Sequence, residues 1–81
     1  MADKEIVCTV VKLYDEKETR NGKLRIQIVR WGKYKPVLEK REYWTDQEGV
    51  EKTGKAKGLN LDDIKIIKDN LIEITDLLSK E

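Results

Sequence analysis

Hydrophobic and polar residues alternate through residues 23–31, with the period of two that is typical of a β-strand. One face of this strand consists of Leu24, Ile26 and Ile28, and the other of Arg25, Gln27, Val29 and Trp31. The aliphatic face is expected to pack in the core. The opposite face, which carries an arginine and a tryptophan, is expected to be exposed to solvent or to form an interface.

Three further strands are expected at about residues 5–14, 37–45 and 50–54, where β-branched and aromatic residues gather between turn signals. Asn21-Gly22 is a pair that favours positive φ angles in tight hairpins, and residues 15–20 are expected to be a polar connection that leads to it. Pro36 should precede the third strand, and Asp46–Gly49 has the pattern of a type I turn. Neither face of the third strand is apolar throughout.

The period changes to that of a helix over about residues 61–79. Apolar residues recur there at intervals of three and four, as Ile64, Ile67, Leu71, Ile74 and Leu78. Asn60 or Asp62 is the expected N-cap. Four strands and one amphipathic helix predict a single α+β domain over residues 1–81, with the order ββββα.

The core of so short a chain is expected to be thin. Of its 81 residues 38% are hydrophobic and 41% are charged. Cys8 is the only cysteine and cannot form an internal disulfide, and without histidine a zinc or iron site is not expected. Self-association remains as the source of extra stability, and a twofold homodimer that contacts through the helical stripe is its simplest form.

The net charge of +1 conceals a segregation of charge along the chain. The net charge is −1 over residues 1–20, +5 over residues 21–58 and −3 over residues 59–81. A basic middle between acidic ends is typical of a face that binds a polyanion. It is equally compatible with solvated strands in a highly charged chain.

Catalytic and cofactor-binding patterns are lacking. There is no histidine to pair with a nucleophile, Cys8 lies among apolar residues, and no glycine-rich phosphate loop occurs. We therefore expect neither enzymatic activity nor a metal or other cofactor. The sequence shows no signal peptide and no apolar stretch long enough to span a membrane, so an intracellular location is expected, in the cytoplasm or nucleoid, or in the nucleus of a eukaryote.

Basic and aromatic residues are interleaved in the middle of the chain, on the second to fourth strands and their loops. They are Arg25, Arg30, Trp31, Lys33, Tyr34, Lys35, Arg41, Tyr43, Trp44, Lys52, Lys55 and Lys57. Cations that follow phosphates and aromatic rings that stack on unpaired bases bind single-stranded nucleic acid in this way. The tryptophans are equally explained as core or dimer-contact residues, the lysines as a solvated surface, and Tyr43 as structural.

Three blocks of the sequence resemble the C-terminal domain of transcriptional positive cofactor four, over about residues 22–78. The blocks are Gly22–Arg30 (GKLRIQIVR), Arg41–Gly49 (REYWTDQEG), and Lys52–Lys55 followed by Lys57–Leu61. The resemblance implies an intertwined homodimer whose curved sheets bind single-stranded DNA with little sequence preference, in transcription, replication, recombination or repair. The sequence departs from the family at Lys40, where the family has an isoleucine, and in the loop around Lys57, which has one extra residue.

The resemblance assigns DNA contacts to basic and aromatic positions, while the helical stripe is expected to form the dimer interface. The expected DNA-binding residues are Arg25, Arg30, Trp31, Lys33, Lys35, Arg41, Trp44, Lys52, Lys55 and Lys57. Two alternatives stay open: a protein-interaction module that docks an acidic partner from the transcription or replication machinery, and an RNA-binding protein.

Overall fold

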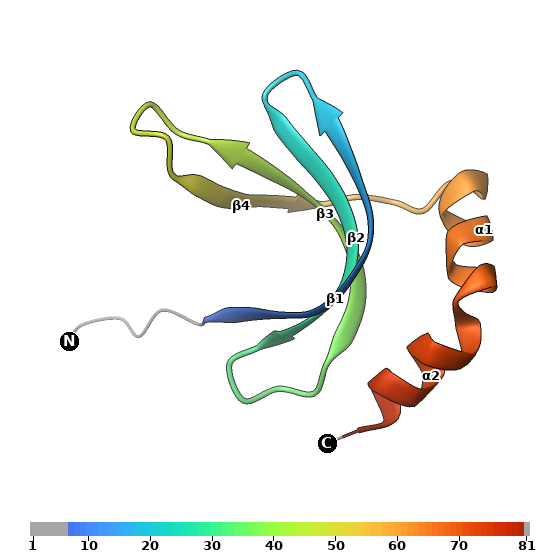
Figure 1. Ribbon diagram of the computed structural model, residues 1–81. Coiled ribbons are helices and arrows are strands. Elements are labelled where there is room, and N and C mark those ends of the chain that lie inside the picture. The colour runs from blue at the N-terminus through green and yellow to red at the C-terminus, as the bar shows by residue number, and fades with distance from the viewer. Residues whose placement is uncertain (1–6, 81) are drawn as a thin grey trace.

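The fold is a four-stranded antiparallel sheet followed by two helices, and the computed structural model describes residues 7–80 (Figure 1). The strands are β1 (Cys8–Thr19), β2 (Gly22–Trp31), β3 (Val37–Thr45) and β4 (Glu51–Ala56), which lie in the sheet in chain order. The helices are α1 (Leu61–Asp69) and α2 (Leu71–Ser79). The α+β class and the four strands are confirmed. The expected start of the first strand at residues 5 and 6 lies outside the described residues.

The β1–β2 hairpin differs from the expectation in two ways. Residues 15–19, expected to be a connection, continue β1, which stays paired with β2 through register shifts between Val10 and Lys12 and between Leu13 and Asp15. The turn residues are Arg20 and Asn21, and within residues 7–80 positive φ angles occur only at Gly32 and Gly49. Gly22 is needed instead for close approach, because a Cβ there would lie 1.9 Å from the carbonyl oxygen of Tyr43.

The β3–β4 turn forms as expected. The amide of Gly49 donates to the carbonyl oxygen of Asp46 at 3.0 Å, and Gly49 has a φ of 83°. The Asp46 side chain accepts from the amides of Glu48 and Val50, both at 2.9 Å. An aspartate at the first position of a turn often stabilises it in this way.

The sheet is strongly curved, and both helices lie on its convex side (Figure 1). Ile26 and Ile28 are fully buried, as the alternation predicts, and Ile74 of α2 completes the small core. Gln27 and Val29, expected on a face that is exposed to solvent or forms an interface, are buried within the chain. The sheet curves around this face (Figure 1), and Gln27 is hydrogen-bonded to Tyr43 of β3, a contact between strands that two-residue periodicity does not reveal.

The expected single helix is wrong, because Asn70 interrupts it. Asn70 leaves the helical conformation (φ −118°, ψ 17°), and its side chain donates to the carbonyl oxygen of Ile66 at 2.8 Å. Asparagine side chains compete with helical backbone bonds in this manner. The apolar stripe continues with the same period on both sides of Asn70, so the periodicity alone does not predict that the helix is interrupted there.

The helices are anchored to the sheet by a buried ion pair. Lys40 of β3 donates to Asp63 of α1 at 2.6 Å, and their side chains are only 9% and 2% exposed. Asp63 also accepts from the amide of Asn60, while the Asn60 side chain accepts from the amide of Asp63, which completes a capping box at the start of α1. Asn60 is thus the N-cap, one of the two residues expected.

The expected dimer residues are distributed unevenly over the helices. Ile74 is buried within the chain itself, Ile67 and Leu78 are half-buried, and Ile64 and Leu71 are exposed. Leu61 and Ile72 are also exposed on these helices. No helix within residues 7–80 is long and apolar enough to cross a membrane.

Candidate functional site

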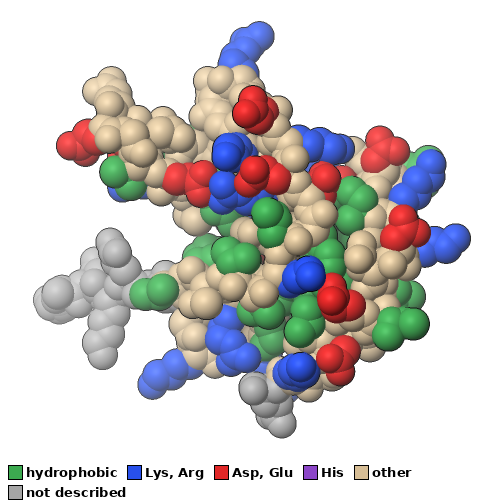
Figure 2. All heavy atoms as spheres, in the orientation of Figure 1, with side chains coloured by type: hydrophobic (Ala, Val, Ile, Leu, Met, Phe, Trp, Pro, Cys, Tyr) green, Lys and Arg blue, Asp and Glu red, His purple; other side chains and the backbone are tan. Residues whose placement is uncertain are grey.

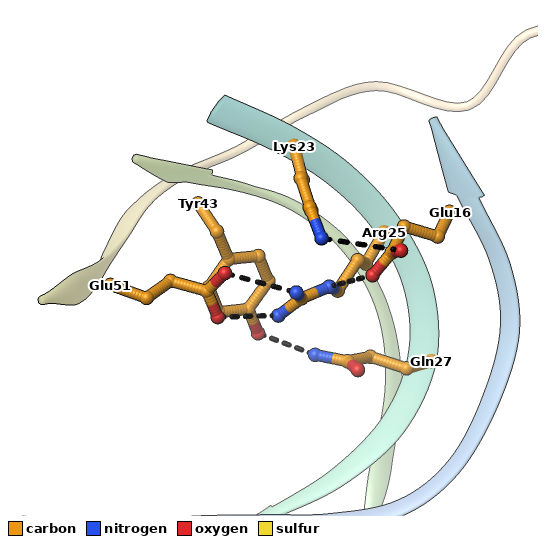
Figure 3. Close-up of polar contacts among 6 residues, drawn as sticks. All are labelled: Glu16, Lys23, Arg25, Gln27, Tyr43 and Glu51. Atoms are coloured by element: carbon orange, nitrogen blue, oxygen red, sulfur yellow. Dashed lines mark hydrogen bonds and ion pairs between the residues drawn. The ribbon is translucent and has the colours of Figure 1, made fainter. Parts of the chain in front are cut away.

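Four side chains, one from each strand, form a row across the concave face (Figure 3). Arg25 of β2 lies at its centre, with its guanidinium 4.7 Å from the ring centre of Tyr43 on β3. The Nε group donates to Glu16 of β1 at 2.6 Å, and the two Nη groups donate to Glu51 of β4 at 2.6 and 3.0 Å. We call Glu16, Arg25, Tyr43 and Glu51 the transverse row.

Two residues of the transverse row, Arg25 and Glu16, are each shifted towards the charged form. The hydrogen bonds that Arg25 donates to Glu51 and, to a lesser degree, to Glu16 raise the pKa of Arg25, despite partial burial. The bond from Arg25, with the nearby ammonium of Lys23 at 3.6 Å, lowers the pKa of Glu16. Burial raises the pKa of Tyr43, whose phenol is therefore neutral at physiological pH. Acidic and basic side chains accordingly lie side by side between the two hairpins (Figure 2).

A buried hydrogen bond supports the row from below. The Gln27 side-chain amide donates to the hydroxyl of Tyr43, and both residues are buried (Figure 3). Because a buried amide without a partner is destabilising, this bond fixes the tyrosine ring beneath the Arg25 guanidinium.

A second cluster of arginine, carboxylate and aromatic ring lies on the same face. Arg41 donates to Glu39 at 2.8 and 3.2 Å and to the Gly54 carbonyl oxygen at 2.8 Å. Its guanidinium lies 5.2 Å from the ring centre of Trp31, whose indole N–H is 3.4 Å from Glu39. The hydrogen bonds that Arg41 donates to Glu39 raise the pKa of Arg41. The Trp31 ring is thus already covered on one side by a cation.

The β2–β3 loop carries cations that, unlike Arg25 and Arg41, are not paired with carboxylates of the described residues. Lys33, Tyr34 and Lys35 are exposed, the tyrosine to 68%, and Arg30 is half-buried at the base of the loop. Gly32 turns the chain with a φ of 57°. None of Arg30, Lys33 and Lys35 forms an ion pair with another residue of the range 7–80. We call Arg30, Lys33, Tyr34 and Lys35 the basic loop.

Trp44 lies at the other end of β3, where it is paired with Gly22 and Lys52 and is 44% exposed. Because side chains alternate along a strand, Trp44 points to the opposite face from Arg41 and Tyr43. The basic loop and Trp44 are separated by the length of β3, roughly 20 Å at about 3.3 Å per residue. The structure therefore does not bring the two tryptophans together in one site.

The cations of β4 and the segment after it are partly neutralised. Lys52 lies 3.8 Å from Asp46, and Lys57 lies 3.5 Å from Glu42. Lys55, which is exposed, has no such partner among the described residues.

Residue-type reasoning identified the arginines but missed the acids that hold them. Glu16, Glu39 and Glu51, together with Gln27, complete the two clusters of the concave face. Glu39 and Arg41 are two positions apart on one strand, so their shared face was visible in the sequence. The contact between Glu51 and Arg25 was not, because it crosses β3.

The possible metal ligands and the single thiol are not gathered in one place within the described residues. Nowhere in the range 7–80 do three histidine, cysteine, aspartate or glutamate side chains lie close enough to hold a metal ion. Burial and the nearby Glu39 raise the pKa of Cys8, which disfavours its thiolate.

Comparison with known proteins adds no assignment. No protein-family model matches the chain, and no solved structure matches it either.

Proposed function

We propose that this protein binds single-stranded DNA without sequence preference and without catalysis, as a homodimer of the positive cofactor four family. The processes it would serve are transcription, replication, recombination or repair. The basic loop carries the proposal, because it combines exposed cations that are not neutralised by other described residues with an exposed aromatic ring. Phosphates attract such cations, and bases that are not paired stack on such rings.

Two further features support the same function. Arg25 and Arg41 present guanidinium groups on the concave face, and Trp44 with Lys52 provides a half-exposed ring and a cation at the far end of β3. A flexible single strand is able to follow these separated contacts, whereas a rigid duplex would have to match the curvature of the sheet. Preference for single strands over duplex is therefore expected.

The direct test measures fluorescence anisotropy of a labelled, unstructured DNA oligonucleotide, with duplex DNA and an RNA of the same sequence as competitors. Tight, salt-dependent binding of the single strand and weaker binding of the duplex are expected. Equal affinity for duplex would contradict the proposal, and a clear preference for RNA would favour the RNA-binding alternative.

A pair of variants with the same change in charge tests the basic loop. Lys33→Gln/Lys35→Gln removes two loop cations, and Lys65→Gln/Lys68→Gln removes two exposed cations from α1. The loop variant should bind more weakly and should lose about 1.4 from the slope of log K against log salt, at about 0.7 per phosphate contact. If both variants weaken binding equally, the loop is not the site and only net charge matters.

Stacking is tested by Trp44→Phe and Trp31→Phe, with tryptophan fluorescence recorded during the DNA titration. Quenching should persist in Trp31→Phe and should disappear in Trp44→Phe, because the Trp31 ring is partly covered by Arg41 whereas Trp44 is 44% exposed. Loss of quenching in Trp31→Phe alone would reverse this assignment.

The homodimer is tested by sedimentation, with the exposed helical residues Leu61, Ile64, Leu71 and Ile72 as the proposed contact surface. Ile64→Glu should shift the protein towards monomer. Ile74 contributes little to this surface, because it is buried within one chain. A wild-type protein that stays monomeric at micromolar concentration would contradict the dimer.

A further inference from the structure

The carboxylates that hold Arg25 come from the two outer strands of the sheet. Glu16 belongs to β1 and Glu51 to β4, and the strand order is β1-β2-β3-β4. Arg25 therefore links the two edges of the sheet across its concave face, above the ring of Tyr43. This linkage spans the concave face, one of the surfaces that the single strand is proposed to contact.

Glu51 binds the Arg25 guanidinium with the same geometry that a phosphate group would use. Glu51 accepts from both Nη groups, at 2.6 and 3.0 Å, so its two oxygens fill the fork of the guanidinium. Phosphate oxygens use the same planar, bidentate arrangement. A phosphate and Glu51 are thus unable to occupy this fork together, and one must replace the other.

The contact is accessible enough for such an exchange. The Arg25 side chain is 17% exposed and that of Glu51 is 40% exposed, whereas the buried Lys40–Asp63 pair is 9% and 2% exposed. Ion pairs that water reaches are weak and sensitive to salt. Glu51 also lies at the start of β4, a six-residue edge strand whose pairing with β3 is irregular between Arg41 and Tyr43.

We infer that Glu51, assisted by Glu16, competes with nucleic-acid phosphates for Arg25, so that binding requires the exchange of a carboxylate for a phosphate. The inference rests on the proposed function. In the free protein the carboxylates neutralise the centre of the concave face, and in the complex a phosphate takes the fork while Glu51 turns to solvent. The acidic residues of the face thus limit affinity and disfavour weak, non-productive anions.

The main test compares Glu51→Gln with Glu48→Gln, which removes an exposed acid from the same β3–β4 hairpin. Both variants change the net charge equally. Glu51→Gln should bind the labelled single strand about fivefold more tightly at low salt, and Glu48→Gln should change affinity by less than about twofold. The salt slope should rise by about 0.7 only in Glu51→Gln, because one more cation is free for a phosphate.

Two further variants separate competition for Arg25 from a general effect of charge. In an Arg25→Gln background, Glu51→Gln should no longer raise affinity, as a double-mutant cycle requires. Glu51→Asp keeps the charge but shortens the side chain, and it should also raise affinity. Three results would overturn the inference. They are equal effects of Glu51→Gln and Glu48→Gln on affinity, a gain in affinity from Glu51→Gln that persists without Arg25, and weaker DNA binding by Glu51→Gln.

Titration with inorganic phosphate separates this inference from the proposed function. The Nε–Hε resonance of Arg25 in NMR spectra should respond at lower phosphate concentration in Glu51→Gln than in the wild type and Glu48→Gln. If that difference appears but no variant binds DNA, the exchange stands and the proposed function fails. If wild type binds DNA but the three proteins respond equally to phosphate, the exchange fails and the proposed function stands.

Discussion

Lys40 and Arg41 are neighbours in the chain, yet their ion pairs have different physical roles. Lys40 points to the convex face and is buried against Asp63 of α1, whereas Arg41 points to the concave face, where its pair with Glu39 is partly open to water. The pair on the convex face joins the helices to the sheet. The pairs on the concave face, those of Arg41 and Arg25, hold cations at a surface that is partly open to water. Burial, rather than the type of residue, makes the difference.

Removal of Lys40 should have the largest effect on stability. Lys40→Met leaves the Asp63 carboxylate buried without its partner, and the free energy of unfolding should fall by about 3–5 kcal/mol. Lys57→Met is the matched control, because Lys57 pairs with Glu42 at an exposed position and should contribute less than about 1 kcal/mol. Urea unfolding of both variants at one protein concentration measures the difference. Similar stabilities would show that the convex pair is not a structural tie.

Protonation of Asp63 should also weaken the Lys40–Asp63 ion pair, with a smaller loss of stability than Lys40→Met. Burial raises the pKa of this carboxyl, but the hydrogen bonds from Lys40 and from the Asn60 amide outweigh burial, and the net shift is downward from 3.8. A lowered pKa in the folded state means that the stabilisation is complete above pH 3.8 and is lost as the pH falls through the folded value. Thermal unfolding from pH 6 downward should show this decline, flattened in Asp63→Asn. An unchanged slope in Asp63→Asn would assign the acid sensitivity to other groups.

The floor of the concave face should be more sensitive than its ion pairs. Tyr43→Phe removes the acceptor for the buried Gln27 amide, and an unsatisfied buried donor destabilises by about 1–3 kcal/mol. Tyr34→Phe, on the exposed β2–β3 loop, should change stability by less than about 0.5 kcal/mol. Chemical unfolding of the two variants provides the comparison. A Tyr43→Phe variant as stable as Tyr34→Phe would mean that water satisfies Gln27.

The smallest effect on stability is expected for the carboxylate that binds Arg25. Glu51→Gln should lower the free energy of unfolding by less than about 1 kcal/mol, because the pair is partly solvated. In thermal unfolding, the difference in stability between the variant and the wild type should become smaller at high salt, because salt screens the ion pair. A large loss of stability would show that the Arg25–Glu51 pair is a structural contact like Lys40–Asp63. The ion pairs of the two faces would then have the same role.

Alternation predicted β2, and β-branched and aromatic residues between turn signals predicted most of the other three strands. The strands at residues 22–31 and 37–45 agree with the expectation to within one residue, and the burial of Ile26 and Ile28 follows from their spacing. The turn at Asp46–Gly49 and the N-cap at Asn60 were also predictable, because each depends on side chains within four residues. Turns and helix caps of this kind are predictable because all the residues that form them lie within one short segment.

The errors occurred where distant segments decide the outcome. Residues 15–19 are polar, yet they form a strand because β2 offers them a partner along its whole length. Asn70 ends a helix whose apolar period continues unchanged on both sides. The basic middle of the chain suggested free cations, but Arg25 and Arg41 are neutralised by acids, and the acid that fills the Arg25 fork, Glu51, comes from a non-adjacent strand.

The sequence by itself determined the fold class and most of the strands, and it narrowed the cap of the first helix to two residues, one of which, Asn60, forms it. These depend on periodicity and on contacts between near neighbours in the chain. Only the tertiary structure decided that Lys40 is a buried tie, that Arg25 is held by both edges of the sheet, and that Trp31 and Trp44 lie apart. The physical reason is that strand pairing and the packing of α1 against the sheet bring together residues that are far apart in the chain.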